Sequence, residues 1–183
     1  MLLKKLIEIL KTFDKPELKK FRRFIGSDYF NTNESVCRLF RLIYVFHPEF
    51  EDIESKLSPE VLFKKIYGAR KYDEKTWRYL LSTLSSLVEK YLAISMFESS
   101  ELEMKKYTID EMIERRLFKS ASRNLAAAES QIDANPLIHG EYIYNKIDFS
   151  LLWHQLYFIS NMQDPLIEKR IEQGELQLFC SLV

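Results

Sequence analysis

Apolar residues recur at three- and four-residue intervals along almost the whole chain, and this spacing restricts the fold more than any other feature. The longest stripe follows Asp73, a residue suited to begin a helix, and continues for about five turns. It consists of Trp77, Leu80, Leu81, Leu84, Leu87, Val88, Tyr91 and Leu92. We find no stretch with the two-residue alternation typical of a strand. The spacing therefore predicts an all-α protein.

The composition agrees with a folded helical protein. Four glycines and five prolines in 183 residues are too few for the turns of an all-β fold. Two distant cysteines, Cys37 and Cys180, lie in apolar helical patterns, which favours buried thiols in a reducing compartment. Lys4, Lys5 and Glu8 interrupt the apolar residues of the amino terminus, and no apolar run approaches about 18 residues. We therefore expect a cytoplasmic protein without a membrane partner.

The charge is divided unevenly between two halves. Residues 1–97 contain 18 Lys and Arg against 13 Asp and Glu, whereas residues 98–183 contain 9 against 14. The short polar stretch Glu98–Glu101 lies between two helical patterns and marks the boundary. We expect a basic helical bundle over 1–97 and an acidic half of antiparallel helical hairpins over 98–183. The asymmetry indicates either an anionic partner for the basic half or attraction between the halves.

Start and stop signals place the individual helices. Asp14 and Asn33 are expected to cap two helices of the first half, Ser58 another, and Gly26 and Gly68 to end two of them. In the second half we expect helices near 101–116, 118–133, 139–160 and 165–181. The helix over 139–160 is apolar around most of its circumference, so we expect it to be sandwiched between neighbours.

The stretch from Leu117 to Glu129, ending at Asn135-Pro136, resembles the second helix of a tetratricopeptide-type repeat. Small residues at Ala121 and Ala128 would allow close helix contact, and the proline fits a turn between repeats. The first-helix consensus is not visible upstream. The resemblance implies stacked antiparallel helix pairs and specifies no partner.

The segment over residues 57–92 resembles the helix-turn-helix of response-regulator-type winged helices. The residues that carry the likeness are Leu57–Leu62, Ile66–Gly68 and Asp73–Leu92. The resemblance implies that Lys75, Arg78, Tyr79 and Ser82 face the major groove of DNA. The sequence departs from the family after Leu92, because it continues as helix where the family has a β-hairpin wing. The whole chain is also similar to uncharacterised bacterial helical proteins, a likeness that implies no function.

A basic group on the second predicted helix is the strongest electrostatic feature. It lies mostly opposite the apolar stripe of that helix and forms either a phosphate-contacting surface or a solvated face. Together with the helix-turn-helix-like pair it defines a set of candidate nucleic-acid contacts. These residues are Lys15, Lys19, Arg22, Arg23, Lys75, Arg78 and Ser82.

Other chemistries find no support in the residue spacing. The three histidines, His47, His139 and His154, occur without a second ligand at metal-binding spacing. Each glycine stands alone, so no phosphate-binding loop is possible, and no nucleophile elbow occurs. We expect no catalytic residue, cofactor, metal or small-molecule ligand, and not an enzyme.

The last residues, Leu176–Val183, form an apolar helical run without a polar cap. Stacked-helix proteins usually end in an element with a polar outer face. We therefore expect this run to be buried in a homodimer or to continue into a longer protein. The function that these features favour is a protein–protein interaction or scaffold module with aromatic-rich surfaces. The alternative is a DNA-binding transcriptional regulator that uses the 58–92 helix pair and basic residues of 15–23.

Overall fold

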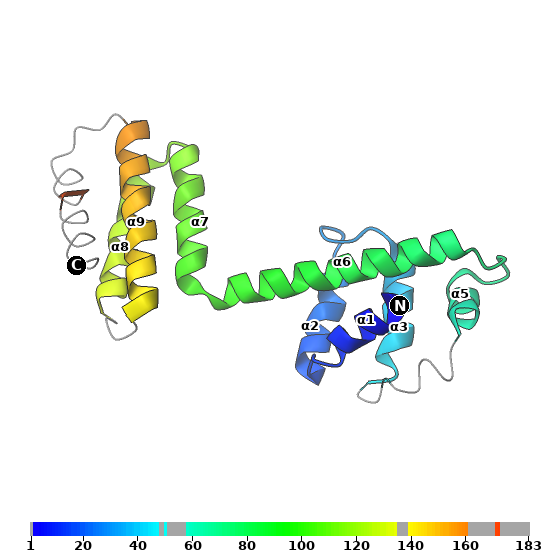
Figure 1. The fold of residues 1–183 in the computed structure, drawn as a ribbon. Coiled ribbons are helices and arrows are strands. Elements are labelled where there is room, and N and C mark those ends of the chain that lie inside the picture. The colour runs from blue at the N-terminus through cyan, green and yellow to red at the C-terminus, as the bar shows by residue number, and fades with distance from the viewer. Residues whose placement is uncertain (1, 48–49, 51–57, 135–138, 161–170, 173–183) are drawn as a thin grey trace. The chain divides into compact units, whose positions relative to one another are not determined.

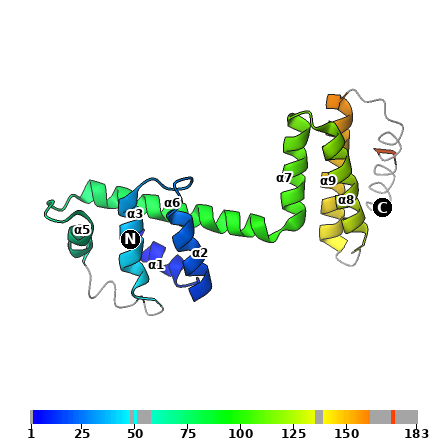
Figure 2. The same ribbon diagram turned by 180° about the vertical axis from the view of Figure 1, so that it is seen from behind.

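The protein is helical throughout the part of the chain that the structure describes. This computed structural model describes residues 2–47, 50, 58–134, 139–160 and 171–172, and 81% of these residues are helical. No strand occurs in these ranges, and eight helices are defined within them (Figures 1 and 2). The predicted all-α class is confirmed.

The chain divides into two compact units, Met1–Ser95 (unit 1) and Met96–Val183 (unit 2). The division falls within one long helix, α6, which runs over Glu74–Ser99. The boundary expected between residues 97 and 98 lies in this same helix. The expected polar linker Glu98–Glu101 is helical apart from Ser100, whose side chain caps the next helix by accepting from the Glu103 N–H at 3.4 Å.

Unit 1 contains α1, α2, α3, α5 and most of α6. The helices before α6 are α1 (Leu2–Leu10), α2 (Lys15–Ile25), α3 (Glu34–Tyr44) and α5 (Pro59–Tyr67). In the interior of this unit α3 contacts both α2 and α5. Residues 48–49 and 51–57, which hold most of an acidic stretch, lie outside the described residues.

The sequence signals for helix starts are confirmed by hydrogen bonds. Asp14 accepts from the backbone N–H of Glu17 at 2.7 Å, and Asn33 accepts from that of Ser35 at 3.0 Å. Asp73 accepts from the N–H of Thr76 at 2.8 Å, and the hydrogen bond from the Thr76 hydroxyl, together with this backbone bond, lowers the pKa of Asp73. Each carboxylate or amide thus satisfies a donor that an α-helix leaves unpaired in its first turn.

The core of unit 1 is built around aromatic rings. Phe21 is fully buried, and its ring lies 5.0 Å from Phe40 and 5.2 Å from Tyr91, centre to centre, in edge-on contacts. Phe13 meets Phe21 edge-on at 5.9 Å. Aromatic pairs favour this geometry because the positive ring edge meets the negative ring face. The rings therefore join α2, α3 and α6 into one core.

Among the described helices, α6 has the length and apolar composition to cross a membrane. Its apolar stripe is nevertheless buried in unit 1, from Trp77 to Tyr91. Burial in the core of unit 1 thus accounts for this apolar stripe. Leu92, expected to continue the buried stripe, is 39% exposed instead, because the core of unit 1 ends at Tyr91.

Unit 2 is formed by α7 (Glu101–Glu114), α8 (Phe118–Asp133) and α9 (His139–Ser160). Each of these helices contacts the other two, and they lie side by side in both ribbon views (Figures 1 and 2). Their bounds agree with the predicted ones to within two residues. The buried core consists of Ile109, Ile113, Ala121, Leu125, Ala128, Ile132, Phe149, Leu152, Trp153 and Leu156.

The helix expected over 165–181 lies outside the described residues except at 171–172, which are helical. Ile171 packs against the core of unit 2. In a tetratricopeptide-like stack, α9 and the helix expected over 165–181 would form the second antiparallel pair. The terminal run Leu176–Val183 and Cys180 also lie outside the described residues.

Replacing Arg116 by glycine is expected to raise the stability of unit 2. Arg116 has a φ of 60° at the end of α7, where its N–H donates to the Ile113 carbonyl and the Leu117 N–H to that of Met112. This left-handed position costs a residue with a Cβ about 1–2 kcal/mol, which exceeds the chain entropy that glycine loses. We expect a gain of about 0.5–1 kcal/mol in urea unfolding. Arg115→Gly, at the preceding residue with a negative φ of −81°, is the control and should destabilise.

Candidate functional site

The basic residues predicted to contact nucleic acid on the second helix are solvent-exposed. Lys15, Lys19, Arg22 and Arg23 all lie on α2, whose buried face consists of Leu18, Phe21 and Ile25. No ion pair within the described residues involves these four cations, so α2 presents a positive outer face.

The second group of candidate contacts lies on the first turns of α6. Lys75, Arg78 and Ser82 are exposed, and Tyr79 beside them is 67% exposed. Arg78 pairs with Glu74 at 2.5 Å, with both side chains largely in solvent. Such an exposed pair contributes little to stability but partly neutralises the arginine.

Helix α2, which holds one basic group, contacts a part of α6 that is distant from the other basic group. The rings of Phe21 and Tyr91 place α2 against the later turns of α6. Tyr91 is about 20 Å along the helix axis from Arg78, at 1.5 Å per residue. The helix-turn-helix-like pair also continues as helix to Ser99, and no wing occurs in the described ranges. The contact between Phe21 and Tyr91 therefore does not bring the basic residues of α2 next to those of α6.

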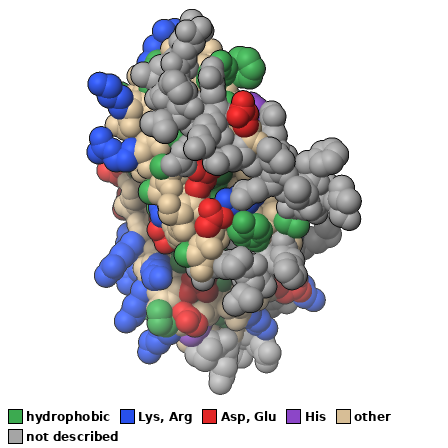
Figure 3. Space-filling view, turned by 90° about the vertical axis from the view of Figure 1, so that its left-hand side faces the viewer, with side chains coloured by type: hydrophobic (Ala, Val, Ile, Leu, Met, Phe, Trp, Pro, Cys, Tyr) green, Lys and Arg blue, Asp and Glu red, His purple; other side chains and the backbone are tan. Residues whose placement is uncertain are grey.

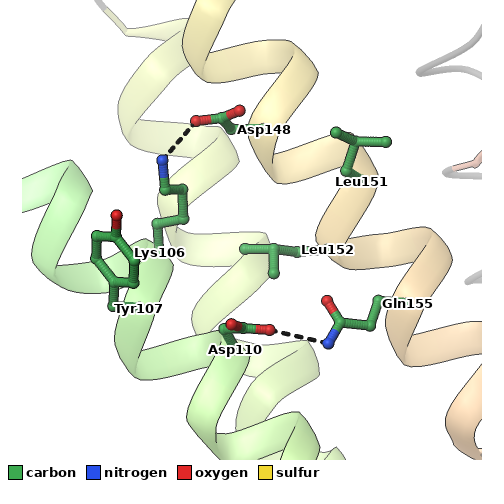
Figure 4. A pocket seen from close by; sticks show the side chains of 7 residues that line it. All are labelled: Lys106, Tyr107, Asp110, Asp148, Leu151, Leu152 and Gln155. Atoms are coloured by element: carbon green, nitrogen blue, oxygen red, sulfur yellow. Dashed lines mark hydrogen bonds and ion pairs between the residues drawn. The ribbon is translucent and has the colours of Figure 1, made fainter.

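A hollow of about 170 Å³ lies between α7 and α9, entirely within unit 2. Figure 4 shows Tyr107 on α7 and Leu151 on α9 at its two sides, with Leu152 between the helices. We call this hollow, with the outer face of α9 beside it, the α7–α9 groove. The residues that line the hollow are Lys106, Tyr107, Asp110, Asp148, Leu151, Leu152 and Gln155.

Three polar contacts between described side chains cross the groove and hold α7 against α9. The Lys106 ammonium donates to Asp148 at 2.7 Å and to Glu103 at 3.2 Å (Figure 4 shows the first). The hydrogen bond to Asp148 raises the pKa of Lys106, although partial burial opposes this. The Gln155 amide donates to Asp110 at 2.9 Å and to Glu114 at 3.4 Å. These side chains therefore position the two helices.

An exposed apolar row runs along α9 beside the hollow. Tyr144, Leu151 and Phe158 occur at seven-residue intervals and are 74%, 60% and 72% exposed. Seven residues are two helical turns, so the three side chains share one face of the helix. The facing Tyr107 of α7 is 54% exposed. The space-filling view shows apolar side chains among charged ones of both signs (Figure 3).

The sequence predicts that the 139–160 helix is sandwiched between neighbours, but the described helices α7 and α8 cover one side of it and leave another side exposed. Helices α7 and α8 cover the side of α9 that holds Phe149, Trp153 and Leu156, but the row from Tyr144 to Phe158 faces outward. Composition alone does not distinguish a helix that is covered on both sides from one with an exposed apolar face, because this helix is apolar on both faces. The buried Phe149 and Leu156 are also seven residues apart, so the spacing does not distinguish the exposed row from the buried face.

Metal-binding groups do not gather in the described part of the chain. No three His, Cys, Asp or Glu side chains within it are placed to hold a metal ion. His154 lies on α9, and His47 meets the ring of Phe50 at 5.8 Å. The Cys37 thiol donates to the Ile25 carbonyl at 3.1 Å and is partly buried in unit 1.

Comparison with known proteins adds no relative: no family model, no curated protein and no solved structure matches this chain.

Proposed function

We propose that this chain is a helical protein–protein interaction module and that the α7–α9 groove binds its partner. The exposed row of Tyr144, Leu151 and Phe158 carries this proposal. Large apolar side chains on the surface of monomeric proteins usually stand singly, whereas an aligned row beside a hollow is typical of an interaction site. Stacking of further tetratricopeptide-like helix pairs, as the sequence of α8 implies, would extend such a surface as a scaffold.

The size of the hollow supports a macromolecular partner. Sites for small molecules usually enclose about 300–1,000 Å³, and the hollow of about 170 Å³ is smaller. Tyr107 lines the hollow, and Tyr144 and Phe158 are exposed on α9. These rings favour a larger occupant, because tyrosine and phenylalanine are enriched where proteins meet.

The state of Lys106 supports binding rather than catalysis. A lysine that acts as a base or nucleophile needs a lowered pKa, so that the amine is available. Here the pKa of Lys106 is raised by its hydrogen bond to Asp148, so the side chain stays an ammonium. We accordingly propose no enzymatic activity for this groove.

The double variant Leu151→Glu/Phe158→Glu is expected to lose the partner. Two carboxylates in the apolar row remove contact area and must be desolvated on binding. In affinity capture from a cell extract with quantitative mass spectrometry, captured partners should fall by about tenfold or more. Both positions are exposed, so the thermal unfolding of the variant should match that of the parent protein.

The matched control places the same charges on exposed apolar residues of unit 1. Tyr29 and Val45 are 85% and 77% exposed. Tyr29→Glu/Val45→Glu should retain every protein that the groove variant loses. Capture of the same proteins by the groove variant and the parent would reject the groove as the binding site.

DNA binding through α6 is the alternative, and we expect it to fail a direct test. The ring contact that joins α2 to α6 is at Tyr91, about 20 Å along the helix axis from Arg78. With a labelled random-sequence duplex at low salt, fluorescence anisotropy should be the same for the parent and for Lys75→Glu/Arg78→Glu. Micromolar binding that weakens steeply with salt and is lost in this variant would instead favour the regulator.

A further inference from the structure

The α7–α9 groove is negatively charged. Four carboxylates surround it, from Glu103, Asp110 and Glu114 on α7 and from Asp148 on α9. Lys106 is the single cation among the side chains that line the hollow or bond to them in the described chain. Four carboxylates and one ammonium leave a net charge of −3 beside the apolar row.

Two of these carboxylates are available to a partner. Lys106 is already bound to Asp148 and Glu103. Asp110 and Glu114 accept only from the uncharged amide of Gln155, and no cation pairs with either within the described ranges. An arriving Lys or Arg would therefore form the first ion pair of both carboxylates.

The shape of the site favours a helix as the occupant. The row over Tyr144, Leu151 and Phe158 repeats every two turns, about 10.5 Å apart along the axis. An amphipathic helix that packs nearly parallel or antiparallel to α9 repeats its own apolar residues at the same interval. The residues that flank the apolar face of this incoming helix would then lie opposite Asp110 and Glu114. An extended segment has a two-residue repeat that does not match this row.

We infer that the partner of the α7–α9 groove is a basic amphipathic helix, whose apolar face covers the row on α9 and whose Lys or Arg residues pair with Asp110 and Glu114. This inference rests on the proposed function, that the groove binds a protein. Complementary charge both attracts the basic helix and excludes acidic ones, because like charges across an interface are costly. The same charge repels nucleic acid.

Two synthetic helical peptides test this inference on the full chain. Each is about 15 residues long, the span from Tyr144 to Phe158, and carries leucines at helical a and d positions. The remaining positions hold lysine in one peptide and glutamate in the other. By fluorescence anisotropy, the lysine peptide should bind more than about tenfold more tightly, and its affinity should fall as salt is raised.

Removing the two available charges should weaken binding of the lysine peptide and preserve the contact of α7 with α9, because the side-chain oxygens of Asn and Gln can still accept from Gln155. We expect Asp110→Asn/Glu114→Gln to reduce the affinity for the lysine peptide by about fivefold. The affinity of this variant should also fall less steeply as salt is raised. Glu8→Gln/Asp28→Asn, which removes two exposed carboxylates of unit 1, is the matched control and should bind as the parent does. Equal weakening by the control would overturn the inference, because the attraction would then be general.

The outcomes separate this inference from the proposed function. If both peptides bind equally and Leu151→Glu/Phe158→Glu abolishes both, the groove binds helices but the basic partner is wrong. If neither peptide binds, the basic amphipathic helix is rejected. The capture experiment with the groove variant then decides independently whether the groove binds a protein at all.

Discussion

Replacing Phe21 by alanine is expected to lower the stability of unit 1 by about 3–5 kcal/mol. The side chain is fully buried and meets the rings of Phe13, Phe40 and Tyr91, so its removal leaves a cavity that these rigid rings fill poorly. Since whole domains are stable by about 5–15 kcal/mol, this loss is a large share of the total for unit 1.

The two tryptophans allow each unit to be followed separately. Trp77 lies in the core of unit 1 and Trp153 in that of unit 2, and the chain has no others. With fluorine-labelled tryptophan, the NMR signal of Trp77 in Phe21→Ala should lose its native position at much lower urea than in the parent. The signal of Trp153 should keep its midpoint. Tyr29→Ala, at a ring that is 85% exposed, is the control and should change neither.

A joint shift of both signals in Phe21→Ala would contradict this expectation. It would mean that the two units unfold as one cooperative structure. The partially stable variant Phe21→Leu keeps the test usable if Phe21→Ala leaves unit 1 unfolded without urea.

Enlarging Ala128 to leucine is expected to destabilise unit 2 by about 1–3 kcal/mol. Ala128 and Ala121 are fully buried on α8, in the core that α7 and α9 complete. Small side chains there let the neighbouring helices approach closely, and a leucine must displace packed atoms because interiors have few voids.

The neighbouring alanine provides the matched control. Ala127 is exposed on the same helix, and leucine there should change the free energy of unfolding by less than about 0.5 kcal/mol. In Ala128→Leu the midpoint of the Trp153 signal should fall while that of Trp77 remains. No destabilisation in Ala128→Leu would show that α8 is not closely packed at this point.

The local structure of the chain was largely predictable from its residues. The helical spacing, the capping residues Asp14, Asn33 and Asp73 and the bounds of α7, α8 and α9 are all confirmed. These features depend on residues within a few positions of one another, so their physical causes are visible in the sequence.

The candidate site was not predictable in the same way. Lys106 and Asp148, like Asp110 and Gln155, are distant in the sequence and meet because α7 packs against α9. The basic residues of α2 and α6 were grouped by charge in the sequence, but the ring contact between these helices does not bring them together. The contact of Phe21 with Tyr91 places α2 against the later turns of α6, whereas Lys75 and Arg78 lie on its first turns.

By itself, the sequence determined the helical class of this protein, most of its helix starts and the division of its charge. Helix formation and capping are local, so spacing and residue type suffice for them. Only the tertiary structure decided which apolar face of α9 is buried and which carboxylates stand beside the exposed row of Tyr144, Leu151 and Phe158. That choice depends on which neighbours cover each face, and helix packing brings those neighbours from distant parts of the chain.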